Sequence, residues 1–191
     1  MDAAFQLVSN EVNVRPLRLR DWRDLESILM SERKWLEPWE ATVPGGSRLL
    51  DVKGMVRSLL RQHREGSALA CVIEVDSKIV GQVNVANILY GSVSSGSIGY
   101  WISEKYAGRS ITPTAVALIS DYMFNQMRLH RVEIAVRPEN EASLRIVEKL
   151  GFRFEGLKER YIHINGDWRD HKIFALTRDE ARKGLISRLE R

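Results

Sequence analysis

The sequence predicts a mixed α/β fold, in which one sheet carries helices on its faces. Segments with apolar residues at every second position alternate along the chain with segments of three- and four-residue apolar spacing, the patterns of strands and amphipathic helices. Two turn signals, Asp76-Ser77-Lys78 and Asn165-Gly166, indicate hairpins between neighbouring strands. With 191 residues the chain can bury one sizeable core, so we expect a single domain over residues 1–191.

The expected strands are short apolar or alternating segments bounded by turn residues. The first begins at Val12, where apolar residues alternate with arginines. Pro138 ends a later strand, because proline lacks the N–H that a sheet needs. The strands predicted in this way are 12–19, 69–75, 79–89, 98–103, 132–136, 152–154, 160–164 and 173–176.

Helices are predicted from apolar faces and from residues that suit helix ends. Helices are expected from residue 21, over 52–60, from 112, and from 140 to a C-terminal glycine at 151. A terminal helix is expected over 178–191, and residues 31–47 should form a loop or a broken helix. The residues that suit the helix starts are Asp21, Thr112 with Pro113, Asn140, and Thr177 with Glu180.

Composition excludes several classes of protein. Hydrophobic residues make up 44% and charged residues 28%, which is ordinary for a globular chain. No stretch approaches the roughly 20 apolar residues that a bilayer span needs, and the first residues lack a secretory signal pattern. We therefore expect a cytoplasmic protein without membrane contact. The net charge of +4 (29 − 25) suits an anionic ligand, but no dense basic block indicates direct nucleic-acid binding.

The chain offers little for disulfide or metal chemistry. Its only cysteine, Cys71, lies in an apolar run, where a thiol usually packs as a small buried side chain. His130, His163 and His171 do not follow the spacing of a helix-borne ligand pair. We expect no metal site.

The most informative segment is 99–122, GYWISEKYAGRSITPTAVALISDY, which predicts a strand, a short basic loop and a helix. Backbone N–H groups at a helix N-terminus bind anions, because they have no partner within the helix and the helix dipole adds partial positive charge. Arg109 adds a full positive charge to the loop. Residues 106–114 are therefore a candidate phosphate site, with an ordinary strand–helix connection as the alternative.

This segment and the chain around it resemble the GNAT acyltransferase superfamily. Residues 140–152, NEASLRIVEKLGF, carry its Asn-x-x-Ser pattern at Asn140 and Ser143 and end on Leu-Gly-Phe. Residues 166–171, GDWRDH, and 35–39, WLEPW, are similar to the RimJ/RimL branch, whose members acetylate N-termini of ribosomal proteins. The resemblance covers about residues 12–177 and implies a twisted, mostly antiparallel central sheet with helices on both faces.

The resemblance also implies acetyl-CoA as cosubstrate, with its pyrophosphate at the loop. The family pattern, Gln/Arg-x-x-Gly-x-Gly/Ala, falls on residues 107–112, so Ser110 and Thr112 stand where glycine or a small residue is usual. Ser110 would either crowd the phosphate or donate a hydrogen bond to it. The implied cofactor contacts are Gly108, Arg109, Ser110, Ile111, Thr112, Pro113 and Thr114, joined by Asn140, Ser143 and the strand residues Tyr100, Trp101 and Ile102.

Acetyl transfer needs a neutral amine, while a free α-amino group has a pKa of about 7.7–8.0. Glu133, on the strand that flanks the expected cleft, is the first candidate base, with a salt bridge to Arg131 or Arg137 as its alternative role. Glu37, acting through water, and Asp170 are further candidates.

The resemblance implies two further catalytic roles. Backbone N–H groups of residues 100–102 would stabilise the oxyanion. Ser143 would stabilise the departing thiolate, with Tyr161 in reserve, and a capping role at its helix start is the alternative for Ser143.

The expected acceptor is a primary amine, most simply the N-terminal α-amine of a protein such as a ribosomal protein, which attacks directly in a ternary complex. Aromatic residues would wall its groove, with core packing as their alternative. Two other functions remain open: acetylation of a small amine (aminoglycoside, polyamine or amino acid), and a non-catalytic module that binds CoA. The acceptor-groove candidates are Glu37, Trp39, Tyr161 and Trp168, with Tyr100 beside them.

Overall fold

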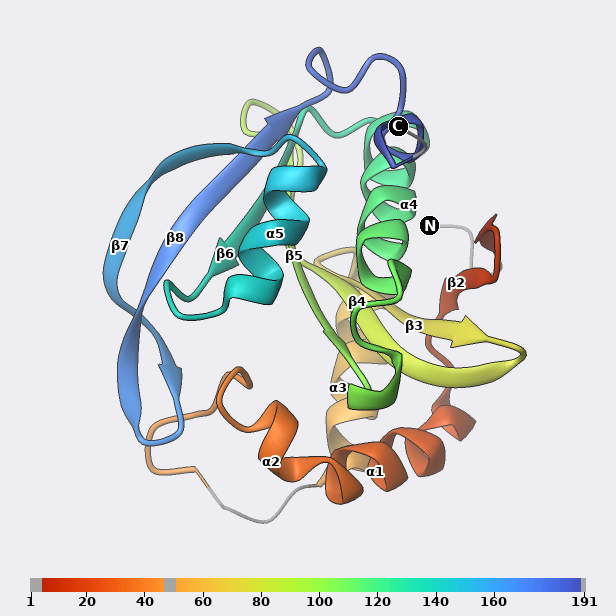
Figure 1. Ribbon diagram of the computed structural model, residues 1–191, viewed down its shortest axis with the longest axis vertical. Coiled ribbons are helices and arrows are strands. Elements are labelled where there is room, and N and C mark those ends of the chain that lie inside the picture. The colour runs from red at the N-terminus through yellow and green to blue at the C-terminus, as the bar shows by residue number, and fades with distance from the viewer. Residues whose placement is uncertain (1–4, 47–50, 190–191) are drawn as a thin grey trace.

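The computed structural model describes residues 5–46 and 51–189 (Figure 1). One eight-stranded sheet runs through them in the order β1-β2-β3-β4-β5-β6-β8-β7. β5 and β6 pair in parallel, and all other neighbouring strands pair antiparallel. The elements are β1 (Leu7–Ser9), β2 (Val12–Pro16), η1 (Leu19–Asp21), α1 (Trp22–Ser31), α2 (Arg33–Leu36), α3 (Val52–Glu65), β3 (Leu69–Val75), β4 (Lys78–Leu89), β5 (Ser95–Ile102), η2 (Glu104–Tyr106), α4 (Ile111–Asn125), β6 (Arg131–Val136), α5 (Glu141–Lys149), β7 (Arg153–Ile164), β8 (Asp167–Thr177) and η3 (Ile186–Arg188).

Helices cover both faces of the sheet, which confirms the predicted mixed α/β architecture. α4 and α5 pack on one face through a large apolar cluster that includes Ile119, Met123 and Val147 (Figure 1). α1 and α3 pack on the opposite face through a second cluster that includes Leu25 and Val56. The burial of these apolar faces is the main source of stability for such a layered fold.

The parallel pair of strands separates along its length. β5 and β6 pair only at Ser95–Arg131, Gly96–Val132 and Ser97–Glu133 within the described residues. β5 continues to Ile102 and β6 to Val136 without further pairing to each other. A wedge therefore opens in the middle of the sheet, between strands that are well anchored on their outer sides.

Both predicted hairpin turns are confirmed. Asp76 and Ser77 have φ values of 50° and 61°, and Asn165 and Gly166 have 48° and 87°. Two successive residues with positive φ make the turn that matches the twist of paired antiparallel strands. The hairpin strands β7 and β8 run longer than the sequence indicates, because cross-strand pairing, interrupted by two register shifts, carries them through polar residues.

Helix α4 begins two residues earlier than the sequence predicts. Its N-cap is Ser110, so Thr112 and Pro113 lie inside the first turn. Proline is tolerated there, because the first N–H groups of a helix have no intrahelical partner to lose. The short N-terminal strand β1 was not predicted; it forms by pairing with β2.

The C-terminal segment differs from the expected helix over 178–191. Within the described residues it forms turns and the short η3, and residues 190–191 lie outside them. The Thr177 N–H does donate to Glu180 at 2.8 Å, as a capping box requires. Gly184 then takes a φ of +74°, and the Asp121 carboxylate of α4 accepts the Leu185 N–H at 2.8 Å, so the segment docks on α4 instead of continuing as a helix.

Of the segment expected as a loop or broken helix over 31–47, residues 33–36 form α2, and residue 47 lies outside the described residues.

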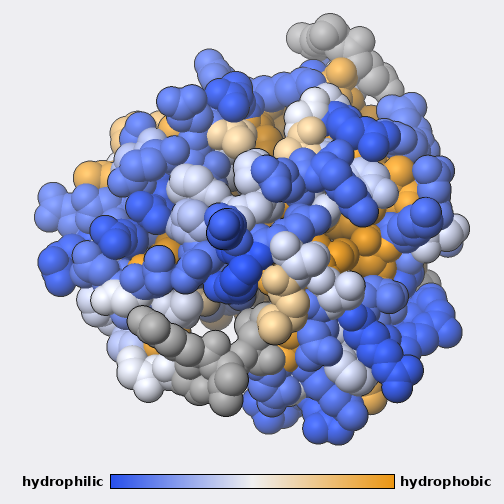
Figure 2. Space-filling view, turned by 60° about the horizontal axis from the view of Figure 1, so that its bottom comes forward, coloured by the Kyte–Doolittle hydropathy of each residue, from blue (hydrophilic) through white to orange (hydrophobic). Residues whose placement is uncertain are grey.

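The face seen in Figure 2 is mostly hydrophilic, with small apolar areas between polar side chains. No helix in the described ranges is long and apolar enough to cross a bilayer.

Candidate active site

A cavity of about 990 Å³ fills the wedge between β5 and β6. Its walls include residues 98–102 of β5 and 134–136 of β6, together with the loop before α4 and the first half of α5. It is also lined by Trp35 and Trp39, in and after α2, and by Gln82 of β4, whose cross-strand neighbour Trp101 packs in the α1–α3 cluster. The cavity therefore connects the two faces of the sheet, and a donor and an acceptor can enter it from opposite sides.

Backbone donors point into this wedge. The Ser103 N–H donates to the Val80 carbonyl at 2.8 Å, and β4 pairs with β5 in an unbroken antiparallel register from Gly81–Ile102 to Ala86–Ser97. Hydrogen bonds to one neighbour alternate along an antiparallel strand, so Trp101 bonds to β4. The N–H groups of Tyr100 and Ile102 therefore point away from β4, toward the opening. Two of the three N–H groups that were predicted to stabilise the oxyanion, those of Tyr100 and Ile102, therefore point toward the opening.

Ser143 and Tyr100 meet on the α4–α5 side of the cavity. Asn140 caps α5 by accepting the Ser143 N–H at 3.1 Å, which fixes the position of Ser143 in the first turn. The Tyr100 hydroxyl is buried beside Ser143 without normal hydrogen-bond geometry. Burial raises the pKa of Tyr100 to about 12, and the neighbouring Ser143 hydroxyl opposes the increase. Both hydroxyls are therefore protonated and able to donate near neutral pH.

The loop before α4 lies on the same side. Gly108 has a φ of +76° and faces open space. Ser110 also adopts a left-handed φ, of +59°, which costs an L-residue roughly 1–2 kcal/mol. Its side chain makes no capping bond, so the hydroxyl stays available to a ligand. The loop residues that line the cavity are Ala107, Gly108, Ser110, Ile111, Thr112 and Pro113.

Two predicted loop contacts lie elsewhere. Arg109 points to Glu11, at 3.3 Å, and its guanidinium stacks over Tyr106. Thr114 is buried and donates to the Ser110 carbonyl at 2.8 Å. Neither residue lines the cavity.

Positive charge comes instead from α5. Arg145 and Lys149 line the cavity across from the loop, and Arg145 is largely exposed with an ion pair to Glu141. Neither residue was predicted from the sequence, although their spacing from Glu141, four and eight positions, places all three on one helix face. A cavity with a backbone loop on one wall and two cations on the other suits a phosphate-bearing ligand.

The opposite side of the cavity is apolar and aromatic. The Trp35 indole N–H donates to the Ile102 carbonyl at 2.9 Å, which fixes α2 against the end of β5. Trp39 also lines the cavity and stacks with Arg137, whose guanidinium donates to the Pro38 carbonyl at 2.7 Å. Two tryptophans in a predicted loop thus serve as the wall of a groove.

His171 lines the cavity as well, although its place in the sequence suggested only a metal ligand. It is buried on β8, where its Nδ1 lies 3.0 Å from the Arg169 carbonyl. Because a carbonyl only accepts, Nδ1 carries the proton and Nε2 is left as a proton acceptor. Burial lowers the pKa of His171, and Arg137 lowers it further, while the Arg169 carbonyl, Glu139 and Asp170 oppose the shift.

The three carboxylates predicted as possible bases lie outside the cavity lining. Glu133 forms an ion pair with Arg131 at 2.8 Å, the alternative role that its position had suggested, and Arg131 also pairs with Glu155. Asp170 accepts the Arg160 backbone N–H at 2.8 Å and so braces the β7–β8 hairpin. Glu37 is half-buried at the C-terminal end of α2.

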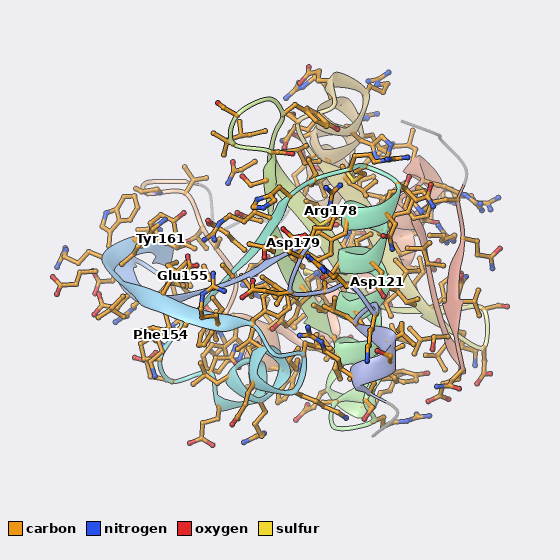
Figure 3. All side chains as sticks on the ribbon, turned by 90° about the horizontal axis from the view of Figure 1, so that it is seen from above. Asp121, Phe154, Glu155, Tyr161, Arg178 and Asp179 are labelled. Atoms are coloured by element: carbon orange, nitrogen blue, oxygen red, sulfur yellow. The ribbon has the colours of Figure 1, made fainter. Side chains whose placement is uncertain are left out.

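Tyr161 and Trp168 also lie outside the lining. Tyr161 is 41% exposed and stands at the outer side of β7, where Lys158 lies over its ring (Figure 3). Its ring meets His171 edge-on at 6.1 Å between centroids. Trp168 is exposed and packs edge-on against His163 near the hairpin tip.

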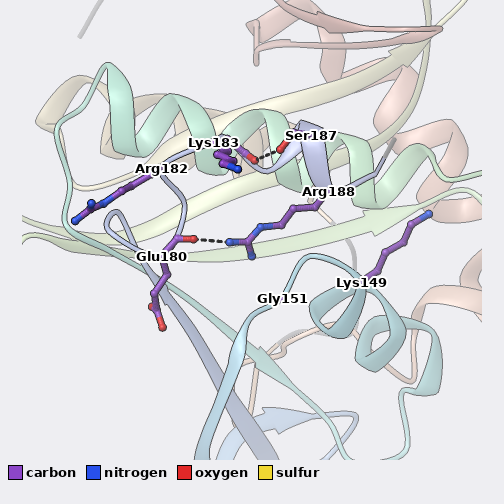
Figure 4. Close-up of a pocket in the computed structure, with 8 residues that line it drawn as sticks. Lys149, Gly151, Glu180, Arg182, Lys183, Ser187 and Arg188 are labelled. Atoms are coloured by element: carbon purple, nitrogen blue, oxygen red, sulfur yellow. Dashed lines mark hydrogen bonds between the residues drawn. The ribbon is translucent and has the colours of Figure 1, made fainter. Parts of the chain in front are cut away.

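A second cavity, of about 590 Å³, lies where the C-terminal segment meets the end of α5 (Figure 4). It is rich in cations, but Arg188 is committed to the carbonyls of Leu150 and Glu180, both at 2.5 Å. Its serine and its carboxylate are also engaged, because Ser187 donates to the Gly184 carbonyl at 2.9 Å and Glu180 pairs with Arg153. Elsewhere, burial raises the pKa of the Cys71 thiol, and the described ranges contain no cluster of three His, Cys, Asp or Glu side chains that could hold a metal.

Comparisons with known proteins agree with this geometry. The chain matches the family described as acetyltransferase (GNAT) domain over residues 11–153. It is 32% identical over 183 residues to the ribosomal protein uS5-alanine N-acetyltransferase of Escherichia coli (strain K12), which covers 90% of each protein. The probable N-acetyltransferase YjcK of Bacillus subtilis (strain 168) is 38% identical over 101 residues, 53% of this chain and 56% of that protein.

Among solved structures, RimJ of Mycobacterium smegmatis in complex with CoA-disulfide superposes with a TM-score of 0.88 at 34% identity. The superposition covers 98% of this chain and 92% of that one. The likeness therefore includes every element that surrounds the wedge.

Proposed function

Because this chain belongs to the GNAT acetyltransferase family and is an N-acetyltransferase, we propose that it moves the acetyl group of acetyl-CoA to the N-terminal α-amine of a protein, such as a ribosomal protein. The observation that carries the proposal is the cavity in the wedge, which opens to both faces of the sheet. The 32% identical relative is named as an N-acetyltransferase of an alanine in ribosomal protein uS5, which supports a protein acceptor here.

The residues present fit the phosphate-bearing arm of acetyl-CoA. Gly108 leaves its side of the loop open, Ser110 offers a free hydroxyl, and Arg145 and Lys149 supply positive charge. The 34% identical structural neighbour contains CoA as a disulfide, which supports the assignment. We assign the cofactor to the α4–α5 side of the sheet and the acceptor to the α1–α3 side.

Each step of the transfer has a residue in position. The acceptor nitrogen first bonds to the acetyl carbonyl carbon, and the carbonyl oxygen becomes an oxyanion. The carbonyl then re-forms as the carbon–sulfur bond breaks and the thiolate of CoA leaves. The N–H groups of Tyr100 and Ile102 stabilise the oxyanion in between. Ser143, backed by Tyr100, donates a hydrogen bond to the departing sulfur.

We assign the role of base to His171, because its Nε2 is a free acceptor within the cavity, whereas Glu133 is held by Arg131. The proton leaves the amine for His171 and finally returns to the thiolate, so that the products are an amide and free CoA.

A carboxylate-rich groove would favour a polycationic small amine, the main alternative. The carboxylates that line the cavity outside α5 are neutralised instead: Glu40 pairs with Arg33, and Glu139 with Arg137 at 3.2 Å. This balance favours an acceptor with a single positive charge.

Two measurements test the proposal. Acetyl-CoA at a hundred times its dissociation constant should stabilise the protein by about 2.7 kcal/mol, which raises Tm by about 5–10 °C in a chain of this size. Release of free thiol should then follow on adding peptides that begin with Ala, Ser or Thr.

Each contrary outcome selects one alternative. No thermal shift at millimolar acetyl-CoA would refute the enzymatic proposal. Binding without thiol release would indicate a non-catalytic module, and release only with polyamines or aminoglycosides would move the acceptor to small amines.

A further inference from the structure

Gln82 of β4 is the one cavity-lining residue whose buried side chain carries an amide donor without a partner within the described ranges. Its side chain is only 2% exposed, and its Nε2 makes no hydrogen bond. Burying an amide donor without a partner costs about 1–3 kcal/mol. Such a group in a ligand cavity points to a ligand atom that completes it.

The orientation of this amide is fixed by its neighbour. Trp101, directly opposite Gln82 on β5, donates its indole N–H to Oε1 at 3.1 Å. Indole is only a donor, so the reverse orientation of the amide would bring two donors together. Nε2 is therefore the end that is left without a partner, in a side chain that belongs to the cavity wall.

The position of Gln82 in the sheet indicates which of the two substrates it can contact. It lies on the α1–α3 side of the sheet, one strand away from Tyr100 and Ile102, whose N–H groups point into the wedge. The cofactor side, with Ser143 and the loop, is the opposite face. Gln82 therefore meets the acceptor and not the acyl donor.

We propose that Gln82 donates a hydrogen bond to a carbonyl oxygen adjacent to the acceptor amine, and thereby restricts the substrates to amines borne by a carbon that also carries a carbonyl group. This inference rests on the proposed function. A peptide N-terminus has such a carbonyl, as do amino-acid amides. A polyamine presents only donors, so it would leave Nε2 buried and unpaired.

The experiment compares two amines that differ at this carbonyl: L-alaninamide, and isopropylamine, in which a methyl group replaces the carboxamide. The ratio of their kcat/KM values is measured for the wild type and for Gln82→Met, a change of similar volume that removes the donor. We expect Gln82→Met to reduce kcat/KM for alaninamide by roughly ten- to hundredfold and for isopropylamine by less than about twofold. Because both enzymes see the same two amines, differences in amine pKa cancel.

Two further variants make the test specific. Gln82→Glu keeps an acceptor for the Trp101 N–H but replaces the donor by a negative charge, so the preference should shift toward spermidine. Gln126→Met, at the exposed end of α4, makes the same chemical change away from the cavity and should alter neither ratio. The acetyl-CoA thermal shift should be unchanged in all three, which shows that the fold and the cofactor side are intact.

The outcomes separate this inference from the proposed function. Equal losses on both amines, or no loss on either, would overturn the role of Gln82 while acetyl transfer by the wild type stands. A wild type that fails to bind acetyl-CoA, or that acetylates polyamines in preference to peptides, would refute the proposed acceptor and this inference with it.

Discussion

His171 illustrates how one side chain acquires a chemical role from its surroundings. The Arg169 carbonyl fixes the tautomer, and burial keeps the imidazole neutral, so Nε2 keeps a lone pair at physiological pH in a side chain that lines the cavity. Charged or polar groups face it from neighbouring elements: Arg137 and Glu139 after β6, Lys158 and Tyr161 on β7, and Asp170 beside it. A neutral imidazole with a free acceptor is the form that general-base catalysis needs.

Replacing His171 should therefore remove the base and its pH dependence. His171→Asn retains a donor to the Arg169 carbonyl, and we expect kcat to fall by about a hundredfold or more with an unchanged KM for acetyl-CoA. Only neutral imidazole accepts a proton, so wild-type kcat should fall as pH decreases through the His171 pKa, which burial places below the usual 6.5. The variant should lack this acidic limb in a kcat–pH profile.

Matched variants decide between candidate bases. His163→Asn changes a half-buried hairpin histidine that contacts Thr42, and Glu133→Gln changes a residue in an ion pair. Both should keep most of the wild-type rate. If Glu133→Gln instead lost activity with an upward shift of its pH optimum, while His171→Asn stayed active, the base would be Glu133.

At the scale of elements, the first turn of α5 links the stability of the protein to the geometry of the cofactor side of the active site. Asn140 satisfies the Ser143 N–H, and the same turn holds the Ser143 hydroxyl beside Tyr100. Arg145 and Lys149 follow on the next turns. One short helix thus positions a hydroxyl for the sulfur and two cations for the phosphates.

Removal of the cap should reduce stability and cofactor affinity together. We expect Asn140→Ala to lower the free energy of unfolding by about 1 kcal/mol and to weaken acetyl-CoA binding about fivefold, since Ser143 is no longer held. Urea unfolding and calorimetric titration measure the two effects, and Asn140→Asp should restore stability.

The chain offers a control for this prediction. Asp51 caps α3 by accepting the Gly54 N–H at 2.8 Å, far from the cofactor side. Asp51→Ala should cost similar stability without a change in cofactor affinity. Unchanged affinity in a folded Asn140→Ala protein would contradict the coupling.

At the scale of the whole molecule, the C-terminal segment closes the fold over α4. Asp121 accepts the Leu185 N–H, and Figure 3 shows it beside this segment. Burial raises the pKa of Asp121 above its ordinary 3.8, opposed by the Leu185 and Ile186 N–H groups and by Arg188. Docking therefore supplies the hydrogen bonds that the expected terminal helix would have made internally.

The raised pKa of Asp121 predicts the direction in which the stability of the protein changes with pH. A carboxyl group that binds its proton more tightly in the folded state contributes most stability below pH 3.8, and this contribution is lost as pH rises through the folded-state pKa. The stability of the wild type relative to Asp121→Asn should therefore decline between pH 4 and pH 7. Thermal unfolding at several pH values measures this difference.

Two variants complete this test. Asp121→Ala should lose about 1–3 kcal/mol, because the Leu185 N–H is left without its partner. Asp179→Asn, at an exposed position of the same segment, should show no comparable pH dependence. A wild-type advantage that increases toward pH 7 would contradict the sign derived from burial.

Much of this molecule follows from its sequence. Period-two and 3.6-residue patterns predicted most strands and helices, and the Asp76-Ser77 and Asn165-Gly166 turns were predicted from residues that tolerate positive φ. The Asn140 cap was predicted as well, because its partner, the Ser143 N–H, is only three residues away. Local rules suffice where both partners of an interaction lie in one short segment.

The tertiary structure decided the features that join distant segments. The separation of β5 from β6 created the cavity, and it brought Gln82, Trp101, Ser143 and His171 to its walls from four elements. Which charged groups face the cavity was also decided there, since Arg131 holds Glu133 in an ion pair and Arg109 pairs with Glu11. These outcomes depend on strand register and on competition among alternative partners, which no single segment of the sequence contains.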